Sequence, residues 1–336
     1  MRTLMALGVL VLLLAGAAGG AGFWYTRALA ARGPDGPAVE IEVPKGASAS
    51  RVGNLLVEHG LIRDPVVMEL WLRIQPPPSS PKAGRHRVAS NATIPELFAA
   101  VAENPLPEDV PVTMVEGWRL RDADAALTEA GRIPAGTYLT AASTAEGYAV
   151  PFPMEGDTLA GYLLPETYLV APGPIDPRAL VQRQLDAFDA RFYRPYRAEI
   201  EKSGLSLRQI VILASLLERE EPKPEVRPRV AGVLYNRLEA GTPLGVDATS
   251  RYTLDDWSDR RAFLKKLRDP EDPWNTRLKA GLPPGPIGAP SEASLLAALR
   301  PVRSKYWYYL HDKDGNIHFA PDGAQHERNR KKYDVW

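Results

Sequence analysis

The stretch SLRQIVILASLLEREEPKP, residues 206–224, constrains the fold most, because it has to form a buried helix with sharply defined ends. Ser206 and Gln209 have the spacing of a capping box, which predicts that the helix begins at about Leu207. Pro222 and Pro224 stop it, since proline cannot continue a helix. A helix that is apolar almost all round belongs inside a core. The rest of the chain is therefore expected to pack around it.

Two acidic residues near the end of this helix point in different directions. With about 100° per residue, Glu218 continues the face of Leu207 and Ala214. Glu220 falls nearly opposite, so the two acids are not expected to act as a pair. The negative end of the helix dipole and the apolar neighbours of Glu218 favour its protonated form, as a general acid requires, whereas Arg219 opposes it. The residues alone leave open the simpler interpretation that the helix has reached the surface.

Composition narrows the classes of protein further. At 336 residues the chain is long for one core, which favours two domains. Forty-one basic residues balance 41 acidic ones, so nucleic acid is not an expected partner. The absence of cysteine excludes disulfides, thiolate metal sites and cysteine nucleophiles. The 32 prolines predict many stiff, extended connections.

The N-terminus carries a targeting signal. Residues 4 to 25 contain no charge and lie between Arg2 and Arg27, and about 20 apolar residues suffice to cross a bilayer. The aromatic run at 23–25 suits a membrane interface. These features predict a single-pass anchor over residues 1–27. The small residues AGAAGGA also allow a cleaved signal peptide. Either interpretation places the remaining chain outside the cytoplasm.

The pattern along the chain predicts an α+β protein in several parts. Residues 28–38 read as a linker, and 39–104 follow a strand–helix–helix–strand pattern with few chemical groups. Residues 105–336 form a larger α+β domain of helices and short strands, ending in a hairpin around the Asp-Gly turn at 314–315. Taken alone, the 39–104 module is expected to bind or position a ligand and to do no chemistry.

The first part of that module resembles a LysM-like unit, a βααβ module that binds glycans. The residues that carry the resemblance are Pro44, Gly46, Ser48, Val52, Leu56, Gly60, Leu61 and Ile62. A capped amphipathic helix accounts for part of the same pattern. The resemblance implies that residues 39–104 contact glycan strands.

Other chemistries lack a signature. The five histidines, at 59, 86, 311, 318 and 326, show no metal-ligand spacing, so no metal site is expected. The chain contains no G-x-S-x-G elbow, Walker loop or dinucleotide fingerprint, and we expect no cofactor. Carboxylates are left as the candidate catalytic groups.

The segment ILASLLEREEPKPEVRPRVAGVLYNRLEAGTPLGVDATSRY, residues 212–252, resembles the core of the endolytic murein transglycosylase family, also called YceG-like. The matching positions are Ala214, Ser215, Glu218, Glu220, Asn236, Arg237, Leu238, Leu244, Asp247, Thr249 and Tyr252. Further matches are Glu116-Gly117, Pro165, Thr167, Tyr168, Asn275-Thr276, GLPPGPI at 281–287, Phe319 and His326. The departures are Trp274 and Arg277 in place of tyrosines, Ala248 in place of a proline and His86 in place of a tyrosine.

This resemblance implies a membrane-anchored lytic transglycosylase on the periplasmic side of the plasma (inner) membrane. It would cut the β-1,4 bond from N-acetylmuramic acid to N-acetylglucosamine inside peptidoglycan strands and leave 1,6-anhydro ends. Such an enzyme needs one carboxylate, because the muramyl 6-hydroxyl replaces water as the nucleophile. The resemblance also implies a link with peptidoglycan synthases, the penicillin-binding proteins.

Each matched residue then receives an expected role. Glu218 is expected to be the catalytic acid/base and Glu220 a supporting residue. Thr249 and Tyr252 are expected to bind substrate or support the site. A final group is expected to line the cleft and to hold sugar or the catalytic carboxyl group in place: Asp247, Asn275 and Thr276. For the last two, capping of the turn before GLPPGP is an alternative.

Two other functions stay open. One is a non-catalytic scaffold that binds glycan and organises synthases. The other is a hydrolytic muramidase, for which Asp247 or Glu220 would act as the second carboxylate that hydrolysis requires.

Overall fold

The computed structural model describes residues 15–16, 19–20, 22–27, 29 and 36–335. The chain divides into two compact units, residues 1–108 and 109–336, a few residues beyond the boundary expected at 104. The predicted anchor over 1–27 and the linker over 28–38 lie largely outside the described residues. Within the described part of the chain, no helix has the length and apolar character needed to cross a membrane.

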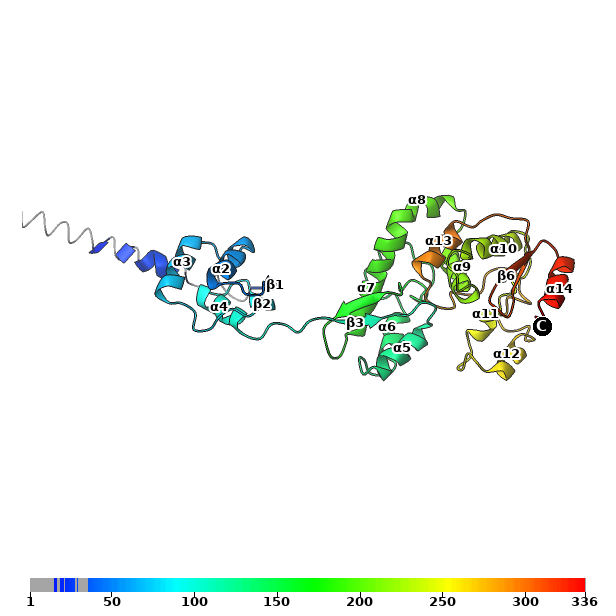
Figure 1. Cartoon of the computed structure of the whole chain (residues 1–336), viewed down its shortest axis with the longest axis horizontal. Helices are drawn as coiled ribbons and strands as arrows, with labels where there is room; N and C mark the ends of the chain where they lie inside the picture. The colour runs from blue at the N-terminus through cyan, green and yellow to red at the C-terminus, as the bar shows by residue number, and fades with distance from the viewer. Residues whose placement is uncertain (1–14, 17–18, 21, 28, 30–35, 336) are drawn as a thin grey trace, which may run out of the picture. The chain divides into compact units, whose positions relative to one another are not determined.

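The first unit is built in the order strand, helix, helix, strand, helix (Figure 1). Its elements are β1 (Ala38–Val43), α2 (Ala49–Glu58), α3 (Pro65–Ile74), β2 (Gly84–Ala89) and α4 (Ile94–Ala102). The two strands pair antiparallel, with Ile41 opposite His86. Local capping fixes the helices, because Ser48 caps α2, Asp64 caps α3, and Thr93 opens α4 with a capping box.

This unit has a core of its own. The inward residues of both strands and all three helices meet there, among them Ile41, Leu56, Met68, Trp71, Val88 and Phe98. The rings of Trp71 and Phe98 pack with their centroids 5.2 Å apart. His86 is also buried, and its Nε2 lies 2.8 Å from the carbonyl oxygen of Lys82, which is a structural contact.

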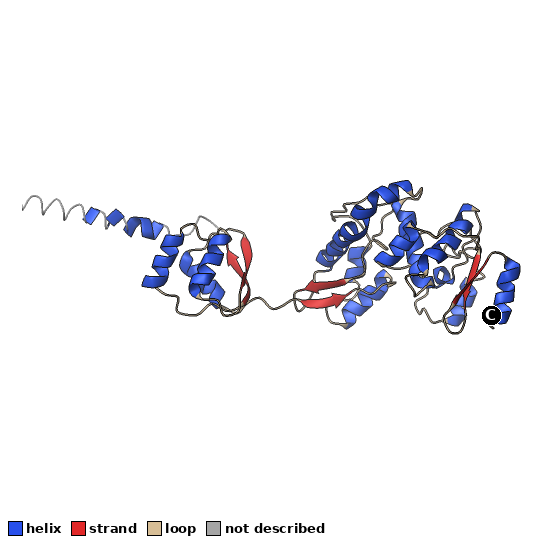
Figure 2. Ribbon diagram, turned by 45° about the horizontal axis from the view of Figure 1, so that its top comes forward, coloured by secondary structure: helices blue, strands red, loops and turns tan. Residues whose placement is uncertain are grey.

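The second unit is mostly helical (Figure 2). Its helices are α5 (Leu120–Glu129), α6 (Thr137–Ala142), α7 (Pro177–Phe188), α8 (Arg194–Lys202), α9 (Leu207–Glu220), α10 (Arg227–Glu239), α11 (Asp247–Arg251), α12 (Arg260–Lys266), α13 (Glu292–Leu299) and α14 (Gly323–Lys332). A π-helical turn, Asp189–Tyr193, joins α7 to α8. The mixed α+β class expected from the sequence is confirmed.

Two small antiparallel sheets complete this unit. β3 (Val110–Thr113) pairs with β4 (Thr167–Val170), and β5 (Tyr308–His311) pairs with β6 (Ile317–Ala320). The second pair is the predicted hairpin, with Gly315 in the left-handed conformation at its turn. β4 was not expected from the sequence, because its pairing partner lies far away in the chain.

Helix α9 is the centre of the second unit. The Ser206–Gln209 capping box opens it at Leu207, as predicted, and every residue from Ile210 to Leu217 is buried. It packs against α10 and α13, and α11 also contacts it. The middle of α9 is therefore enclosed by the core, whereas its last turn carries the acidic residues Glu218 and Glu220.

Candidate active site

Glu220 lies on the wall of a cavity of about 650 Å³ in the second unit. Segments from distant parts of the chain form this cavity. They are the end of α9, the end of α10, the start of α11, the loop around Arg277, β5 and α14. The side chains that these segments contribute include Arg237, Asp247, Tyr309, His326 and Arg330.

The surroundings of Glu220 favour its protonated form. Burial raises the pKa of Glu220, and the negative charge of Asp247 raises it further. The hydroxyl of Tyr309 donates a hydrogen bond of 2.8 Å to Glu220 Oε2, which opposes this shift. The positive field of His311 also opposes it. A carboxyl group that keeps its proton above the usual pH and faces a cavity has the properties of a general acid.

Asp247 is the second carboxylate of the cavity. It begins α11, and its Oδ1 accepts a hydrogen bond of 2.5 Å from Nε of Arg277. This ion pair occupies one carboxylate oxygen of Asp247 and fixes the side chain at the cavity wall. The two carboxyl groups of the cavity are thus unequal, because Asp247 is paired with a guanidinium group and Glu220 is bonded to a tyrosine hydroxyl.

Glu218 is enclosed in a network of donors away from this cavity. Its Oε1 accepts from Arg227 Nη2 at 2.9 Å, and its Oε2 accepts from Arg227 Nη1 at 3.2 Å. The backbone N–H and the hydroxyl of Ser291 donate to the same Oε2. Both charged side chains are almost fully buried, at 4% exposure for Arg227 and 5% for Glu218.

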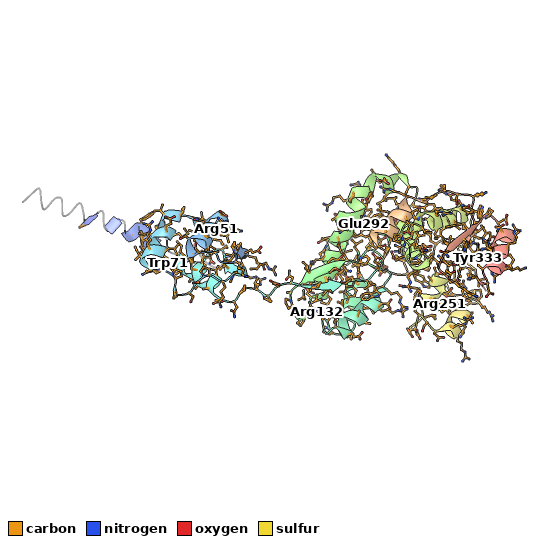
Figure 3. All side chains as sticks on the ribbon, viewed as in Figure 1. Arg51, Trp71, Arg132, Arg251, Glu292 and Tyr333 are labelled. Atoms are coloured by element: carbon orange, nitrogen blue, oxygen red, sulfur yellow. The ribbon has the colours of Figure 1, made fainter. Side chains whose placement is uncertain are left out.

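Glu218 was expected to present its carboxyl group to a substrate, and these contacts enclose that group instead. Arg227 begins α10 and Ser291 caps α13, so the pair joins three helices. Glu292, labelled in Figure 3, is the first residue of α13 next to this contact. The helix-face argument separated the two acids, and the structure places Glu220, not Glu218, on the wall of the cavity. The positive partner could not be read from the helix itself.

The chain matches the model of a known protein family over most of its length. The model described as the YceG-like family matches residues 41–332, which is most of the chain. The chain belongs to the YceG-like family. The resemblance found in the sequence is confirmed.

Relatives of this YceG-like chain have a common name. An endolytic murein transglycosylase of Bacillus subtilis (strain 168) is 24% identical over 313 residues, covering 88% of this chain and 84% of that protein. An endolytic murein transglycosylase of Streptococcus pneumoniae (strain D39) is 22% identical over 319 residues, which is 87% of this chain and 57% of that protein. The fold is similar to the crystal structure of a YceG-like protein from Listeria monocytogenes, with a TM-score of 0.58, 23% identity and coverage of 88% and 99% of the two chains.

Asn275 of the YceG-like chain does not line the cavity. It is 0% exposed, and its Nδ2 donates to the carbonyl oxygens of Lys266, Leu267 and Asp269 at 3.0, 3.1 and 3.2 Å. Its Oδ1 accepts from the N–H of Arg277. Asn275 therefore supports the loop after α12 from the inside, which agrees with a supporting role and leaves no direct contact with the cavity.

Thr249 and Thr276 are also internal supports of the YceG-like fold. Their hydroxyl oxygens lie 3.0 Å apart, and each donates to the carbonyl oxygen of Val246. The N–H of Val246 donates to the Thr276 hydroxyl in return. Both threonines are buried, which contradicts the prediction that Thr276 lines the cleft. They hold the residue before Asp247, so they fix that carboxylate at the cavity wall.

Tyr252 lies at a different place in the YceG-like fold. It helps to line a separate, small cavity with Trp118 and Pro286. Its ring packs on Trp274, with centroids 4.3 Å apart, and its carbonyl oxygen accepts from Arg119. Arg251, labelled in Figure 3, stacks over Phe263 and joins α11 to α12. The structure does not bring Tyr252 to Glu220.

Sequence reasoning gave no functional role to several side chains of the cavity. These are Tyr309, His311, Arg237, Arg277 and Arg330. Tyr309 alternates with His311 in a strand, and two residues apart on a strand share one face. That signal could have placed both on one surface, but only the packing of the hairpin beside α9 brings that surface to Glu220. Among the described residues, no group of three or more His, Cys, Asp or Glu side chains could hold a metal ion.

Proposed function

We propose that this chain is an endolytic lytic transglycosylase that cuts the β-1,4 bond from N-acetylmuramic acid to N-acetylglucosamine in peptidoglycan. Membership of the YceG-like family and relatives named endolytic murein transglycosylase support the reaction class. The observation that carries the site is Glu220, whose pKa is raised by burial on the wall of the 650 Å³ cavity.

Glu220 is the acid/base of this proposal, in place of Glu218. Protonated Glu220 donates its proton to the glycosidic oxygen as the bond to the muramyl C1 breaks. The resulting carboxylate then accepts the proton of the muramyl 6-hydroxyl as that oxygen attacks C1. This second step closes the 1,6-anhydro ring and restores protonated Glu220. The hydrogen bond from Tyr309 orients the carboxyl group throughout.

A hydrolytic muramidase is the second candidate, because Asp247 offers another carboxylate in the same cavity. Its ion pair with Arg277 disfavours that role, since the base of a hydrolase has to accept a proton from water. A non-catalytic scaffold does not require a carboxyl group with a raised pKa in a cavity, so Glu220 favours an enzyme over a scaffold.

Mass spectrometry of digested peptidoglycan separates these functions. The lytic transglycosylase yields internal cuts that end in 1,6-anhydro-muramic acid. Reducing muramic acid ends would establish the hydrolase instead. Intact strands after incubation with folded protein would establish the scaffold and refute both enzymes.

Three further features belong to the same proposal. Residues 39–104, as a LysM-like module, position glycan; the strand–helix–helix–strand order of the first unit supports this. The apolar run at 4–25 anchors the chain as a single pass in the plasma membrane, with the second unit on the periplasmic side. Peptidoglycan synthases are the proposed protein partners.

The anchor has a direct test. The anchor is supported if the chain stays in the membrane fraction until detergent is added and its N-terminus is residue 1 or 2. A mature N-terminus near residue 20 in protein released without detergent would refute it. Retention of a penicillin-binding protein by the detergent-solubilised full chain tests the partnership, with the chain lacking residues 39–104 as a comparison.

A further inference from the structure

The cavity that contains Glu220 carries an excess of positive charge. Three guanidinium groups line it, from Arg237, Arg277 and Arg330. Two carboxyl groups line it among the residues that the structure describes, Glu220 and Asp247. Burial favours the protonated form of Glu220, and Asp247 is paired with Arg277.

Arg237 has no carboxylate partner among the residues that the structure describes. Its Nε donates to the carbonyl oxygen of Trp307 at 2.7 Å, and its Nη1 donates to that of Leu244 at 2.8 Å. The guanidinium lies over the ring of Tyr308, 4.9 Å from its centroid. Burial lowers the pKa of Arg237, because removing this charge from water is unfavourable. An anion bound in the cavity would offset that cost.

The other two guanidinium groups keep donors available. Arg277 uses Nε for Asp247, and 49% of its side chain is exposed. Arg330 makes longer contacts, 3.3 Å to Glu327 and 3.4 Å to the carbonyl oxygen of Val335. Both groups can therefore turn remaining N–H donors toward a ligand.

His326 adds a neutral group between these charges. It lines the cavity and stacks on Tyr308, with ring centroids 5.0 Å apart. Burial and the positive fields of Arg330 and Arg237 lower the pKa of His326. Its Nδ1 is buried without a hydrogen-bond partner in the described structure. A bound ligand could supply that partner. The histidine and the guanidinium groups therefore both have polar atoms available for a ligand in the cavity.

We propose that this end of the cavity binds a carboxylate on the 3-O-lactyl arm of the muramyl residue whose bond is cut. The planar fork of arginine matches a carboxylate with two parallel hydrogen bonds. The N-acetylated sugar rings are uncharged, so the lactyl arm carries the negative charge closest to the muramyl C1. The carboxylate is either that of the free lactyl group or one in a peptide attached to it.

This inference rests on the proposed function and explains which bond is chosen. A glycan strand alternates two sugars, and only the muramyl sugar has a lactyl arm. A carboxylate held by Arg237, Arg277 and Arg330 places a muramyl C1 and its 6-hydroxyl at Glu220. Strands shifted by one sugar would put an uncharged residue beside the three arginines.

Binding to the full chain with Glu220→Gln tests the site without turnover. The first ligand pair is the disaccharide N-acetylglucosaminyl-N-acetylmuramic acid and its lactyl amide. The second pair is the same disaccharide bearing an L-Ala-D-Glu dipeptide, with free or amidated carboxyl groups. We expect an acid to bind about tenfold more tightly than its amide at low salt, which is the scale of a charge-assisted hydrogen bond.

Arginine variants in this background identify the groups that discriminate. Arg237→Gln also removes two donors to backbone carbonyls, so the Arg277→Gln/Arg330→Gln double variant is the safer probe. It should bind acid and amide with equal affinity. Arg303→Gln is the control, because Arg303 is 53% exposed and pairs with Glu239 at 2.6 Å, yet does not line the cavity. It should keep the full tenfold preference.

The outcomes distinguish the lactyl carboxylate from a peptide carboxylate, and the carboxylate site from the proposed reaction. A preference confined to the first pair identifies the lactyl carboxylate, and one confined to the second identifies the peptide. Equal binding of acid and amide in both pairs, or a preference that survives in the double variant, would overturn the carboxylate site. If the unmodified chain makes no anhydro ends but the preference is present, the proposed reaction fails and the carboxylate site stands.

Discussion

The hydroxyl of Tyr309 controls how readily Glu220 ionises. It donates to Glu220 Oε2 and so lowers a pKa that burial has raised. Tyr309→Phe removes this donor, and the pKa of Glu220 should rise further. The alkaline limb of the profile of kcat/KM against pH should therefore move to higher pH, because the protonated acid persists longer. Tyr306→Phe is the control, since Tyr306 packs on Phe319 away from the cavity. A limb that moves to lower pH would contradict the role of this bond.

Asn275 is a structural residue by its contacts. Asn275→Ala leaves three backbone carbonyl oxygens without their donor, so the free energy of unfolding should fall by about 2 kcal/mol. Turnover per folded molecule should stay near normal. Thermal unfolding and single-turnover rates measure the two effects, with Asn316→Ala in the exposed hairpin turn as a control. An unchanged melting temperature with lost turnover would show that Asn275 contacts substrate.

At the scale of elements, Arg227 ties three helices together. It begins α10, binds Glu218 of α9, and donates to the hydroxyl of Ser291, which caps α13. Its Nε also donates to the carbonyl oxygen of Glu221. One buried cation therefore contacts all three helices of this part of the second unit.

Arg227→Gln should destabilise the second unit strongly. It leaves the buried carboxylate of Glu218 without a counter-charge, and breaking a buried ion pair typically costs about 3–5 kcal/mol. Arg229→Gln, on an exposed position of the same helix, should change stability little. Chemical denaturation followed by circular dichroism measures both. Equal stability of the two variants would mean that the Glu218 pair does not hold the helices.

Local elements could be predicted from the sequence more fully than the site. Capping residues and apolar periodicity are local, so the α9 helix, the hairpin at 308–320 and the helices of the first unit were found. The sequence did not predict β4, because a strand of four residues is defined by its pairing with a distant partner, here β3. The site depends on the same kind of distant contact. Helix geometry separated Glu218 from Glu220, but Arg227, Ser291 and Tyr309 decide what each acid faces.

For the whole molecule, the separate cores of the two units matter most. Each hydrophobic core is built from residues of one unit, and the cavity with Glu220 belongs to the second. Deletion of residues 39–104 should therefore leave the second unit folded and able to form anhydro ends. Binding to long glycan strands should weaken, and product lengths should change. Complete loss of anhydro product, in a shortened chain whose circular dichroism shows a folded second unit, would contradict this division of roles.

Stability against pH also distinguishes the two acids. Because the folded-state pKa of Glu220 is raised, its contribution to stability is fully present below the unfolded value, about 4.5, and is lost as pH rises through the folded-state pKa. Glu220→Gln should therefore melt at the same or a higher temperature than the unmodified chain at neutral pH. Glu218→Gln should melt lower, because it removes the anion that Arg227 requires.

The most direct test is the rate of anhydro-end formation by Glu220→Gln and Glu218→Gln, measured together by mass spectrometry and normalised to folded protein. Loss of the transferable proton should reduce the rate of Glu220→Gln by at least about 10²-fold. The folded fraction of Glu218→Gln should retain a rate near that of the unmodified chain. A stable, inactive Glu218→Gln beside a Glu220→Gln of near-normal rate would contradict the assignment of Glu220 as the acid/base.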